Sequence, residues 1–507
     1  MSAATAARPT RVFVVVHALG SGGITHAALD QCNMFAAAGC PVTLVTLTDE
    51  PEGPQIARLR AQGRLTAEIE VRNPHDDLRA LWAKVPAIDD PTGFERLLAR
   101  TDLWVEGRGR APGLERRYTS DGSYVAHVRR DDDGEVVTVG YHREREVGVR
   151  EHWSDGRVRF VEHLSRAGKR DREAWYTPNG HPYLTRTAEP VSGRGAGLMV
   201  QAPGAEARHH RDSFTWHVAW LEQVLGEAGE GAVALANTAS TVTKLARVRG
   251  TGARLFGMLH HCQYDAPFTQ ESPLRKDDQR VFRHVEGLDG LVVLTEPQRR
   301  DMEGLIGHKV PVRAVPNTTR VPDLPEIEKD PRLVTTFARI EPQKALHEAI
   351  HAWARVVEEV PDARFEIYGR GRSMPELKAL VAELGLEASV LFPGRTPEPH
   401  AVMARSVCTL STSDWEAMPL SIMESQASGT PVVAYDCLYG PATLIEDGIT
   451  GRLLDRGDRE GVARAVVELL RDPDRAAEMG RAARQRIEER YAAPVVARQW
   501  EKVFAAV

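Results

Sequence analysis

The apolar residues near the start of the chain form short runs separated by a helical pattern. The run 12–16 is followed by a glycine-rich turn at 20–23, a helix expected over 25–38 and a second apolar run over 42–47. Short continuous apolar runs are typical of parallel strands buried on both faces, and a helix between two of them is a crossover connection. This pattern therefore predicts an α/β domain that opens with a βαβ unit.

The same alternation returns after residue 202 and continues towards the end of the chain. Strands are expected at 233–236, 255–259, 291–294, 333–337, 365–368, 390–392, 407–410 and 432–435. A proline-rich passage over 315–325 divides this series, and such passages are typical of linkers. The pattern therefore predicts two α/β domains.

Between residues 103 and 187 the pattern changes to short polar and β-branched stretches separated by turn pairs. The pairs are Asp121-Gly122, Asp133-Gly134, Asp155-Gly156 and Asn179-Gly180. Asp-Gly and Asn-Gly between strand-like runs favour two-residue hairpin turns, in which both residues adopt a positive φ. We therefore expect an antiparallel β-meander inserted into the first α/β domain.

These patterns give an expected division of the chain. The first α/β domain comprises 1–100 and 190–320, the inserted β-meander 101–189, and the second α/β domain 321–490. A C-terminal helix over 491–507 follows, and one option is that it packs back on the first domain.

Composition narrows the class of protein. Apolar residues make up 42% of the chain and charged residues 27%, as in ordinary globular proteins. With 65 basic and 71 acidic residues the formal charge is −6, which argues against nucleic acid as the main partner. The five cysteines lack metal-ligand spacing, and residues 1–11 lack the apolar stretch of a secretory signal. We therefore expect a cytoplasmic protein with at most peripheral membrane association.

The segment 414–431 holds the most informative chemistry. It follows an apolar run, and Pro419 fits the first turn of a helix that Gly429 ends. The turn would present free backbone N–H groups at the carboxyl edge of a parallel sheet, which is where such sheets bind nucleotides. Two carboxylates frame the turn, Glu416 before the helix and Glu424 within it. A carboxylate on an apolar helix requires hydrogen-bond donors, and the vicinal hydroxyls of a ribose would supply them.

This segment resembles a signature of the retaining glycosyltransferases that have the GT-B fold, the group of glycogen synthase-like and bacterial cell-wall enzymes. The resemblance implies that Glu424 binds the ribose of a nucleotide-sugar donor and that Glu416 contacts the transferred sugar. It also implies that the backbone of Met418, Pro419 and Leu420 holds the donor phosphates. The implied fold consists of two Rossmann-like α/β domains that face a cleft.

A second group fits the same resemblance. Arg339 and Lys344 follow the first expected strand of the second domain, where members of the family carry two cations that hold the diphosphate. Positioned cations stabilise the charge that develops on a leaving nucleoside diphosphate. The resemblance therefore assigns Arg339 and Lys344 to donor binding and catalysis. Ala338 stands where the family usually has glycine.

Several glycine-rich turns match the family layout. After strands of the second domain come Gly369 and Gly371, then Gly394 and Arg395, which the resemblance places around the donor nucleotide. In the first domain Gly22 and Gly23 would let the backbone approach the donor phosphates or the acceptor, since glycine has no side chain. Glycine-rich turns are by themselves weak signals.

Two adjacent histidines follow a strand of the first domain. Their place resembles that of a family histidine that contacts the transferred sugar, although the motif here is imperfect. We expect this role for His260, and His261 stays open as the alternative. A purely structural role for either histidine also stays open.

No cofactor and no metal are expected. The second domain carries no Asp-x-Asp motif at a strand end, and Asp131-Asp132-Asp133 lies in an expected hairpin turn. The donor should be a nucleotide sugar, with UDP as the expected nucleotide because it predominates in the resembling families.

The hairpins of the insertion resemble, in their sequence pattern, those of enzymes that glycosylate wall teichoic acid or serine-rich adhesins. The resemblance implies a polymer or protein acceptor, such as a polyol phosphate, and an insertion that binds it or forms a homo-oligomer. A retaining hexosyltransferase is therefore the predicted function. Two alternatives stay open: a non-catalytic partner or chaperone of such an enzyme, and a nucleotide-sugar epimerase.

Overall fold

The computed structural model describes residues 8–20, 22–48, 53–89, 91–107, 113–143, 146–189, 195–325 and 327–506. Ser21 of the glycine-rich turn and the expected domain boundary at residue 190 lie outside these residues. The chain divides into two compact units. One contains both Rossmann-like halves, namely the residues up to Leu47, Glu52–Val71 and Glu222–Val507. The other contains Arg72–Leu221 and is described separately below.

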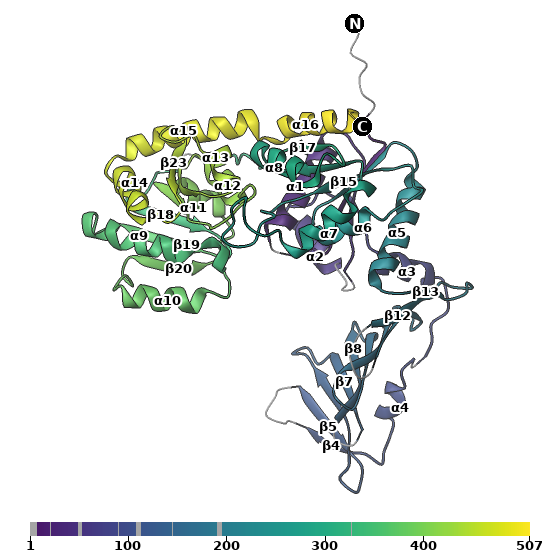
Figure 1. Cartoon of the computed structure of the whole chain (residues 1–507). Coiled ribbons are helices and arrows are strands. Elements are labelled where there is room, and N and C mark those ends of the chain that lie inside the picture. Colours follow the sequence, from purple (N-terminus) through teal and green to yellow (C-terminus); the bar gives the residue numbers. More distant parts are fainter. Residues whose placement is uncertain are drawn as a thin grey trace. The chain divides into compact units, whose positions relative to one another are not determined.

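The N-terminal Rossmann-like half is built on a seven-stranded sheet of order β17-β16-β15-β14-β1-β2-β3 (Figure 1). Its strands are β1 (Arg11–Val16), β2 (Val42–Thr46), β3 (Glu70–Arg72), β14 (Ala232–Ala236), β15 (Arg254–Met258), β16 (Gly290–Val293) and β17 (Val312–Ala314). Its helices are α1 (Gly23–Ala37), α2 (Gly53–Ala61), α5 (Ser213–Ala228, which runs on from the other unit), α6 (Ala239–Leu245), α7 (Lys276–His284) and α8 (Glu296–Ile306). The pairing of β1 with β2 and β14 is parallel, which confirms the expected βαβ opening.

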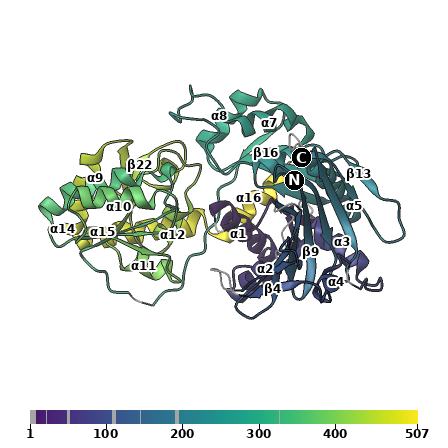
Figure 2. The same ribbon diagram turned by 90° about the horizontal axis from the view of Figure 1, so that it is seen from below.

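The C-terminal Rossmann-like half is built on a six-stranded sheet of order β20-β19-β18-β21-β22-β23. Its strands are β18 (Leu333–Phe337), β19 (Arg364–Tyr368), β20 (Val390–Gly394), β21 (Cys408–Ser411), β22 (Val432–Asp436) and β23 (Gly451–Asp455). Its helices are α9 (Leu346–Glu359), α10 (Met374–Glu383), α11 (Pro399–Arg405), α12 (Leu420–Ala427), α13 (Pro441–Leu444), α14 (Arg459–Arg471) and α15 (Pro473–Arg490). In Figure 2 the helices α9, α10, α11, α12, α14 and α15 lie around β22 of this sheet.

The C-terminal helix α16 (Ala493–Ala505) returns to the N-terminal half and packs on α1. The rings of Trp500 and Phe35 meet edge to face with centroids 5.7 Å apart, and Phe504 lies 5.8 Å from Phe35. Trp500 is 1% exposed. Aromatic burial of this kind dominates core energetics, so α16 forms part of the core of the N-terminal half.

The second unit contains a ten-stranded antiparallel sheet in sequential order. Its strands are β4 (Trp104–Gly107), β5 (Leu114–Tyr118), β6 (Tyr124–Arg130), β7 (Val136–Arg143), β8 (Glu146–Ser154), β9 (Arg157–Leu164), β10 (Arg170–Tyr176), β11 (Pro182–Ala188), β12 (Gly195–Val200) and β13 (Arg208–His210). Its helices α3 (Pro74–Trp82) and α4 (Phe94–Leu98) pack on it. The sheet confirms the expected β-meander but extends beyond residue 189. The strands β12 and β13 were missed because no Asp-Gly or Asn-Gly pair precedes them.

The hairpin turns differ from the expected type in three of the four cases. Asp155 and Gly156 both have a positive φ, of 53° and 67°, as a two-residue turn requires. In the other three pairs only the glycine is left-handed. At the first of these, Gly122 N–H donates to Thr119 O and Thr119 N–H donates to Ser123 O, which is the pattern of a three-residue loop with a glycine bulge. The turn residues were therefore recognised correctly, but the loop length was not.

Buried carboxylates in the antiparallel sheet are neutralised by neighbouring strands. Glu162 on β9 accepts from Arg150 at 3.3 Å, His152 at 3.0 Å and Arg170 at 2.8 Å. Glu173 on β10 is bound by Arg170 and Arg186. Apart from Arg170–Glu173, which lies within β10, these pairs cross adjacent strands, so the charges reinforce the strand register.

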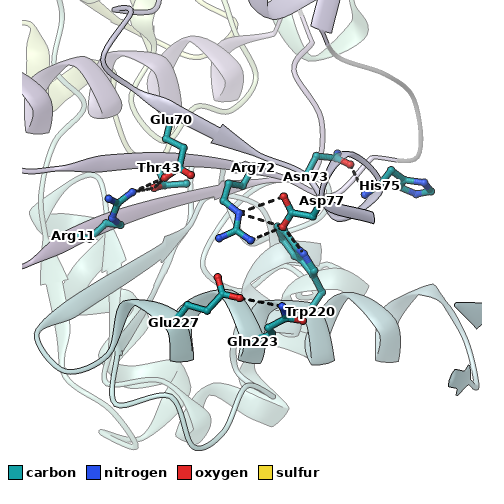
Figure 3. A network of polar contacts seen from close by, with 10 residues as sticks. All are labelled: Arg11, Thr43, Glu70, Arg72, Asn73, His75, Asp77, Trp220, Gln223 and Glu227. Carbon is teal, nitrogen blue, oxygen red and sulfur yellow. Dashed lines mark hydrogen bonds and ion pairs between the residues drawn. The ribbon is translucent and has the colours of Figure 1, made fainter. Parts of the chain in front are cut away.

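A polar network fixes α3 in the second unit (Figure 3). The Asn73 side chain accepts from His75 N–H at 2.8 Å and caps the helix, and Pro74 occupies its first turn. Asp77 accepts from the Arg72 guanidinium and from Trp220 Nε1 at 3.0 Å. These bonds join the start of α3 to Trp220, in the part of α5 that belongs to the same unit.

Among the described residues, no helix combines the length and apolarity needed to cross a lipid bilayer.

Candidate active site

A cavity of about 400 Å³ lies between the two Rossmann-like halves of the first unit. The N-terminal half contributes Gly23, Ile24, His26, His260, His261 and Asn317. The C-terminal half contributes Phe337, Ala338, Arg339, Gln343, Lys344, Tyr368, Gly369, Gly394, Arg395, Thr396, Pro399, Trp415, Glu416, Met418, Pro419, Leu420, Ser421 and Glu424. Most of the second group follow the carboxyl ends of β18, β19, β20 and β21, the edge at which parallel sheets bind ligands.

Glu416 and Lys344 form an ion pair at this edge. The Lys344 ammonium donates to Oε1 of Glu416, and the two side chains are 16% and 9% exposed. The loops that carry them are joined by Gln343, whose carbonyl accepts from Asp414 N–H at 2.9 Å and whose Nε2 donates to Trp415 O at 3.1 Å. The structure therefore brings together two predicted residues that lie 72 positions apart.

Arg339 lies on the same loop as Lys344 but is exposed. Its guanidinium donates to Gln343 Oε1 at 3.2 Å and lines the cavity. A guanidinium in this position is available to an anionic ligand, because an amide oxygen binds it less strongly than a phosphate does.

The start of α12 offers an anion site. Pro419 is the residue before the helix, and no side chain caps the first turn. The N–H groups of Ile422 and Met423 bond back to Pro419 O, whereas Leu420 and Ser421 open the helix and line the cavity. An uncapped helix start presents backbone N–H groups and the positive end of the helix dipole. Asn317 Nδ2 donates to Met418 O at 3.3 Å and braces this turn.

Glu424 lies one turn further along α12 and reaches the cavity. Burial, and next the nearby Asp30 carboxylate, raise its pKa to about 7, while Arg64 opposes the shift. Burial likewise raises the pKa of Asp30, to about 6. A buried carboxylate with a raised pKa is typical of a functional position, because no permanent cation neutralises it.

Both histidines line the cavity, with different partners. His260 Nε2 is 2.6 Å from Asn237 Oδ1, and among the described residues its buried Nδ1 has no hydrogen-bond partner. Burial, and next His261, lower the pKa of His260 to about 3, so its ring is neutral. His261 Nε2 is 2.9 Å from the buried carboxylate of Asp278. The choice between the two for the transferred sugar stays a prediction.

The predicted glycines divide into two groups. Gly23, Gly369 and Gly394 line the cavity, whereas Gly22 and Gly371 are not among its lining residues. A Cβ on Gly371 would stand 2.1 Å from Ile340 O. The missing side chain of Gly371 therefore allows its backbone to pack directly against the backbone of Ile340, next to Arg339.

Some lining residues were missed by the sequence analysis. Phe337 and Tyr368 stack with ring centroids 4.8 Å apart, and both belong to strands that the pattern marks only as buried. His26 faces the cavity from α1, and burial, followed by Arg64 and Arg395, lowers its pKa to about 4. No motif surrounds His26 in the sequence, so only the fold reveals it. Within the part of the chain that the structure describes, no cluster of three or more His, Cys, Asp or Glu side chains is placed to hold a metal ion.

Comparison with known proteins defines the class. Residues 320–486, which make up most of the C-terminal half, match the family described as glycosyl transferases group 1. The two Rossmann-like halves with a cavity between them, and the fold of the solved structures that match the whole chain, show that the chain has the GT-B fold.

The individual relatives extend the match to the whole chain. A poly(ribitol-phosphate) α-N-acetylglucosaminyltransferase of Staphylococcus aureus is 22% identical over 97% of this chain and 99% of its own length. A crystal structure of S. aureus TarM, a mutant in complex with fondaparinux, α-GlcNAc-glycerol and UDP, matches with a TM-score of 0.90 and 21% identity over 98% of this chain and 99% of its own. The pneumococcal O-GlcNAc transferase GtfA in complex with UDP and GlcNAc matches with a TM-score of 0.67 and 16% identity over 98% of each chain.

Proposed function

We propose that this protein is a retaining glycosyltransferase that moves a hexose or N-acetylhexosamine from a UDP-sugar to a hydroxyl group of a polymer, such as a polyol phosphate, or of a protein. The observation that carries the proposal is the arrangement of Glu416, Lys344 and the uncapped start of α12 around one cavity. The relatives that match the whole chain include a transferase that acts on poly(ribitol phosphate) and structures with bound UDP.

In the proposed complex the diphosphate lies between the two cations and the start of α12. Arg339 and Lys344 provide positive charge, and the N–H groups at Leu420 and Ser421 provide hydrogen bonds, so that the leaving diphosphate is stabilised as the glycosidic bond breaks. Divalent metal is unnecessary in this arrangement. Glu424 accepts the ribose hydroxyls, and the neutral His260 holds a hydroxyl of the transferred sugar.

Glu416 faces the sugar in the same proposal. Its carboxylate stabilises the positive charge that develops at the reacting carbon, and no covalent intermediate with the enzyme is assigned. Retention results when the acceptor hydroxyl attacks from the side that the diphosphate leaves.

We assign acceptor binding or homo-oligomer formation to the antiparallel sheet and place the protein in the cytoplasm. Light scattering of the purified chain checks the oligomer directly.

The test is an assay with UDP-GlcNAc alone and then with poly(ribitol phosphate) added. Product that depends on the acceptor, with an α-linkage in its NMR spectrum, supports the proposal. Hydrolysis or epimerisation of the donor without acceptor favours the epimerase alternative. Binding of UDP without turnover on any acceptor favours the alternative of a non-catalytic partner.

A further inference from the structure

A hydrogen-bond network joins the two Rossmann-like halves next to Glu416. In the N-terminal half, Asp301 on α8 accepts from Gln263 Nε2 at 2.9 Å and from Tyr264 Oη at 2.9 Å. Its third bond comes from the C-terminal half, where the Tyr439 hydroxyl donates to Oδ2 of Asp301. Tyr439 Oη also accepts from Gln263 Nε2 at 2.5 Å. The Tyr439 hydroxyl is thus held from the opposite half by two groups.

The backbone of Tyr439 is joined to Glu416 itself. Tyr439 N–H donates to Glu416 O at 2.5 Å, and Glu416 N–H donates to Leu438 O at 2.8 Å. Both backbone groups of Glu416 are therefore bonded to the segment that carries Tyr439. A displacement of the Tyr439 ring would move the peptide that fixes Glu416.

The three groups that donate to Asp301 are buried, whereas Asp301 itself is half-buried. Gln263 is fully buried, Tyr264 is 2% exposed and Tyr439 is 4% exposed. Burial, and next the hydrogen bond to Asp301, raise the pKa of the phenol groups of Tyr264 and Tyr439. Both phenols therefore remain protonated and donate to the carboxylate, and such charge-assisted bonds are stronger than neutral ones.

The residue before Glu416 is held from the N-terminal half as well. The Arg275 guanidinium lies 4.0 Å from the centre of the Trp415 ring, and its Nε donates to Tyr264 O at 3.0 Å. In the reverse direction, Arg456 of the C-terminal half donates to Pro267 O at 2.9 Å and to Asp414 O at 3.2 Å. The loop 414–416 is thus bound on several sides by groups that do not line the cavity.

We infer that Asp301 is a positioning residue. It lies in the N-terminal half and, through its bond to Tyr439, fixes the position of Glu416 in the C-terminal half. The role rests on the proposed function, since it concerns turnover by Glu416. When the two halves separate, the bond between Tyr439 and Asp301 breaks and Glu416 loses its support. Catalytic geometry is then complete only in the closed arrangement, and a displacement of about 1 Å is enough to cost on the order of 100-fold in rate.

Two tyrosine variants separate this role from a structural one. Tyr439→Phe removes the bond between the halves, and Tyr264→Phe removes the other phenol bond to the same carboxylate, within the N-terminal half. We expect Tyr439→Phe to lower kcat by about 10- to 100-fold while the Kd for UDP stays within about twofold. Tyr264→Phe should keep kcat within about threefold. Equal losses in the two variants, or an unchanged kcat in Tyr439→Phe, would overturn the inference.

A double-mutant cycle adds a second measurement. Asp301→Asn removes the charge with little change of shape. The double variant Asp301→Asn/Tyr439→Phe should lose no more kcat than the stronger single variant, because Asp301 acts on Glu416 only through Tyr439 in this inference. Additive losses would contradict the inference. Thermal unfolding establishes that each variant is folded, and Asp301→Asn serves if Tyr439→Phe does not fold. Absence of acceptor-dependent product in the wild type refutes the proposed function itself, and the positioning role falls with it.

Discussion

The carboxylates of Glu424 in the cavity, which is half-buried, and Glu162 in the antiparallel sheet, which is buried, have opposite environments. Glu162 of the sheet is 4% exposed, and burial alone would raise its pKa, but His152, Arg170 and Arg150 lower it overall. Glu424 of the cavity has only the opposing influence of Arg64, and its pKa rises to about 7. The difference teaches that burial alone does not mark a functional carboxylate. The mark is a buried carboxylate whose neutralising partner has to come from a ligand.

The largest expected effect concerns catalysis. Glu416→Gln keeps the shape of the side chain but removes the charge proposed to stabilise the transition state, so kcat should fall by about 100- to 1000-fold, whereas the Kd for UDP should not rise. Glu162→Gln, the matched buried variant in the sheet, should keep kcat within about twofold. Steady-state kinetics and donor calorimetry measure both. A wild-type kcat in Glu416→Gln would remove Glu416 from the site.

The next effect concerns donor affinity and its pH dependence. Glu424→Gln should weaken UDP binding by about 1–3 kcal/mol, the cost of lost hydrogen bonds to a charged group. Because the pKa of Glu424 is about 7, the carboxylate becomes ionised between pH 6 and 8, and wild-type affinity should rise over that interval. Calorimetry on Glu424→Gln supplies the baseline, since this variant retains all the other titratable groups of the protein and of UDP. Identical pH profiles for the two proteins would contradict the ribose assignment.

A smaller effect concerns stability without ligand, and its sign differs between the two regions. The folded-state pKa of Glu424 lies above its ordinary value, so its contribution to stability is present below pH 4.5 and is lost as the pH rises through about 7. Glu424→Gln should therefore raise Tm by a few degrees at pH 8. The pKa of Glu162 is lowered, so its contribution is present above pH 4.5 and is lost below it. Glu162→Gln should lower Tm at pH 8 by about 2–4 °C per kcal/mol lost.

Scanning calorimetry at pH 4.5 and pH 8 checks this pair of predictions. The Tm difference of Glu424→Gln should shrink at the lower pH, whereas that of Glu162→Gln should persist there, because its contribution is lost only as the pH falls further below 4.5. Shifts of the same sign at pH 8 would show that the two carboxylates have similar surroundings after all.

The smallest expected effect is that of metal removal. The cations proposed to hold the diphosphate are the side chains of Arg339 and Lys344, so EDTA should leave transfer within about twofold of the untreated rate. Replacement of Lys344 by Ala should reduce the transfer rate far more than EDTA does. If EDTA abolishes activity and Mn²⁺ or Mg²⁺ restores it, the charge that holds the diphosphate would have to be assigned to a metal ion instead of these side chains.

The parallel sheets could be predicted from the sequence because their strands are continuous apolar runs, as in Val12–Val16. Most hairpins of the insertion were also identified, since Asp-Gly and Asn-Gly pairs mark them. The strands β12 and β13 were not, because they carry neither signal. The loop lengths at Asp121-Gly122 and similar pairs were wrong, since the same dipeptide fits two turn types that differ by one residue.

For the site, motifs that stand next to strand ends could be placed correctly. Lys344 and Glu416 meet because the carboxyl ends of β18 and β21 lie at one sheet edge. His26 and Asp301 could not be found in this way, because their positions depend on how the two halves pack. No local pattern in the sequence records that packing.

The ion pair of Lys344 and Glu416 has a consequence for ligand recognition. Lys344 already has a counterion in Glu416, so a diphosphate bound as proposed would displace a carboxylate rather than meet an unpaired positive charge. Donor binding is then an exchange of one anion for another. Raised ionic strength should therefore weaken UDP binding less than two unpaired cations would imply. The carboxylate released by the exchange is the one proposed to face the sugar.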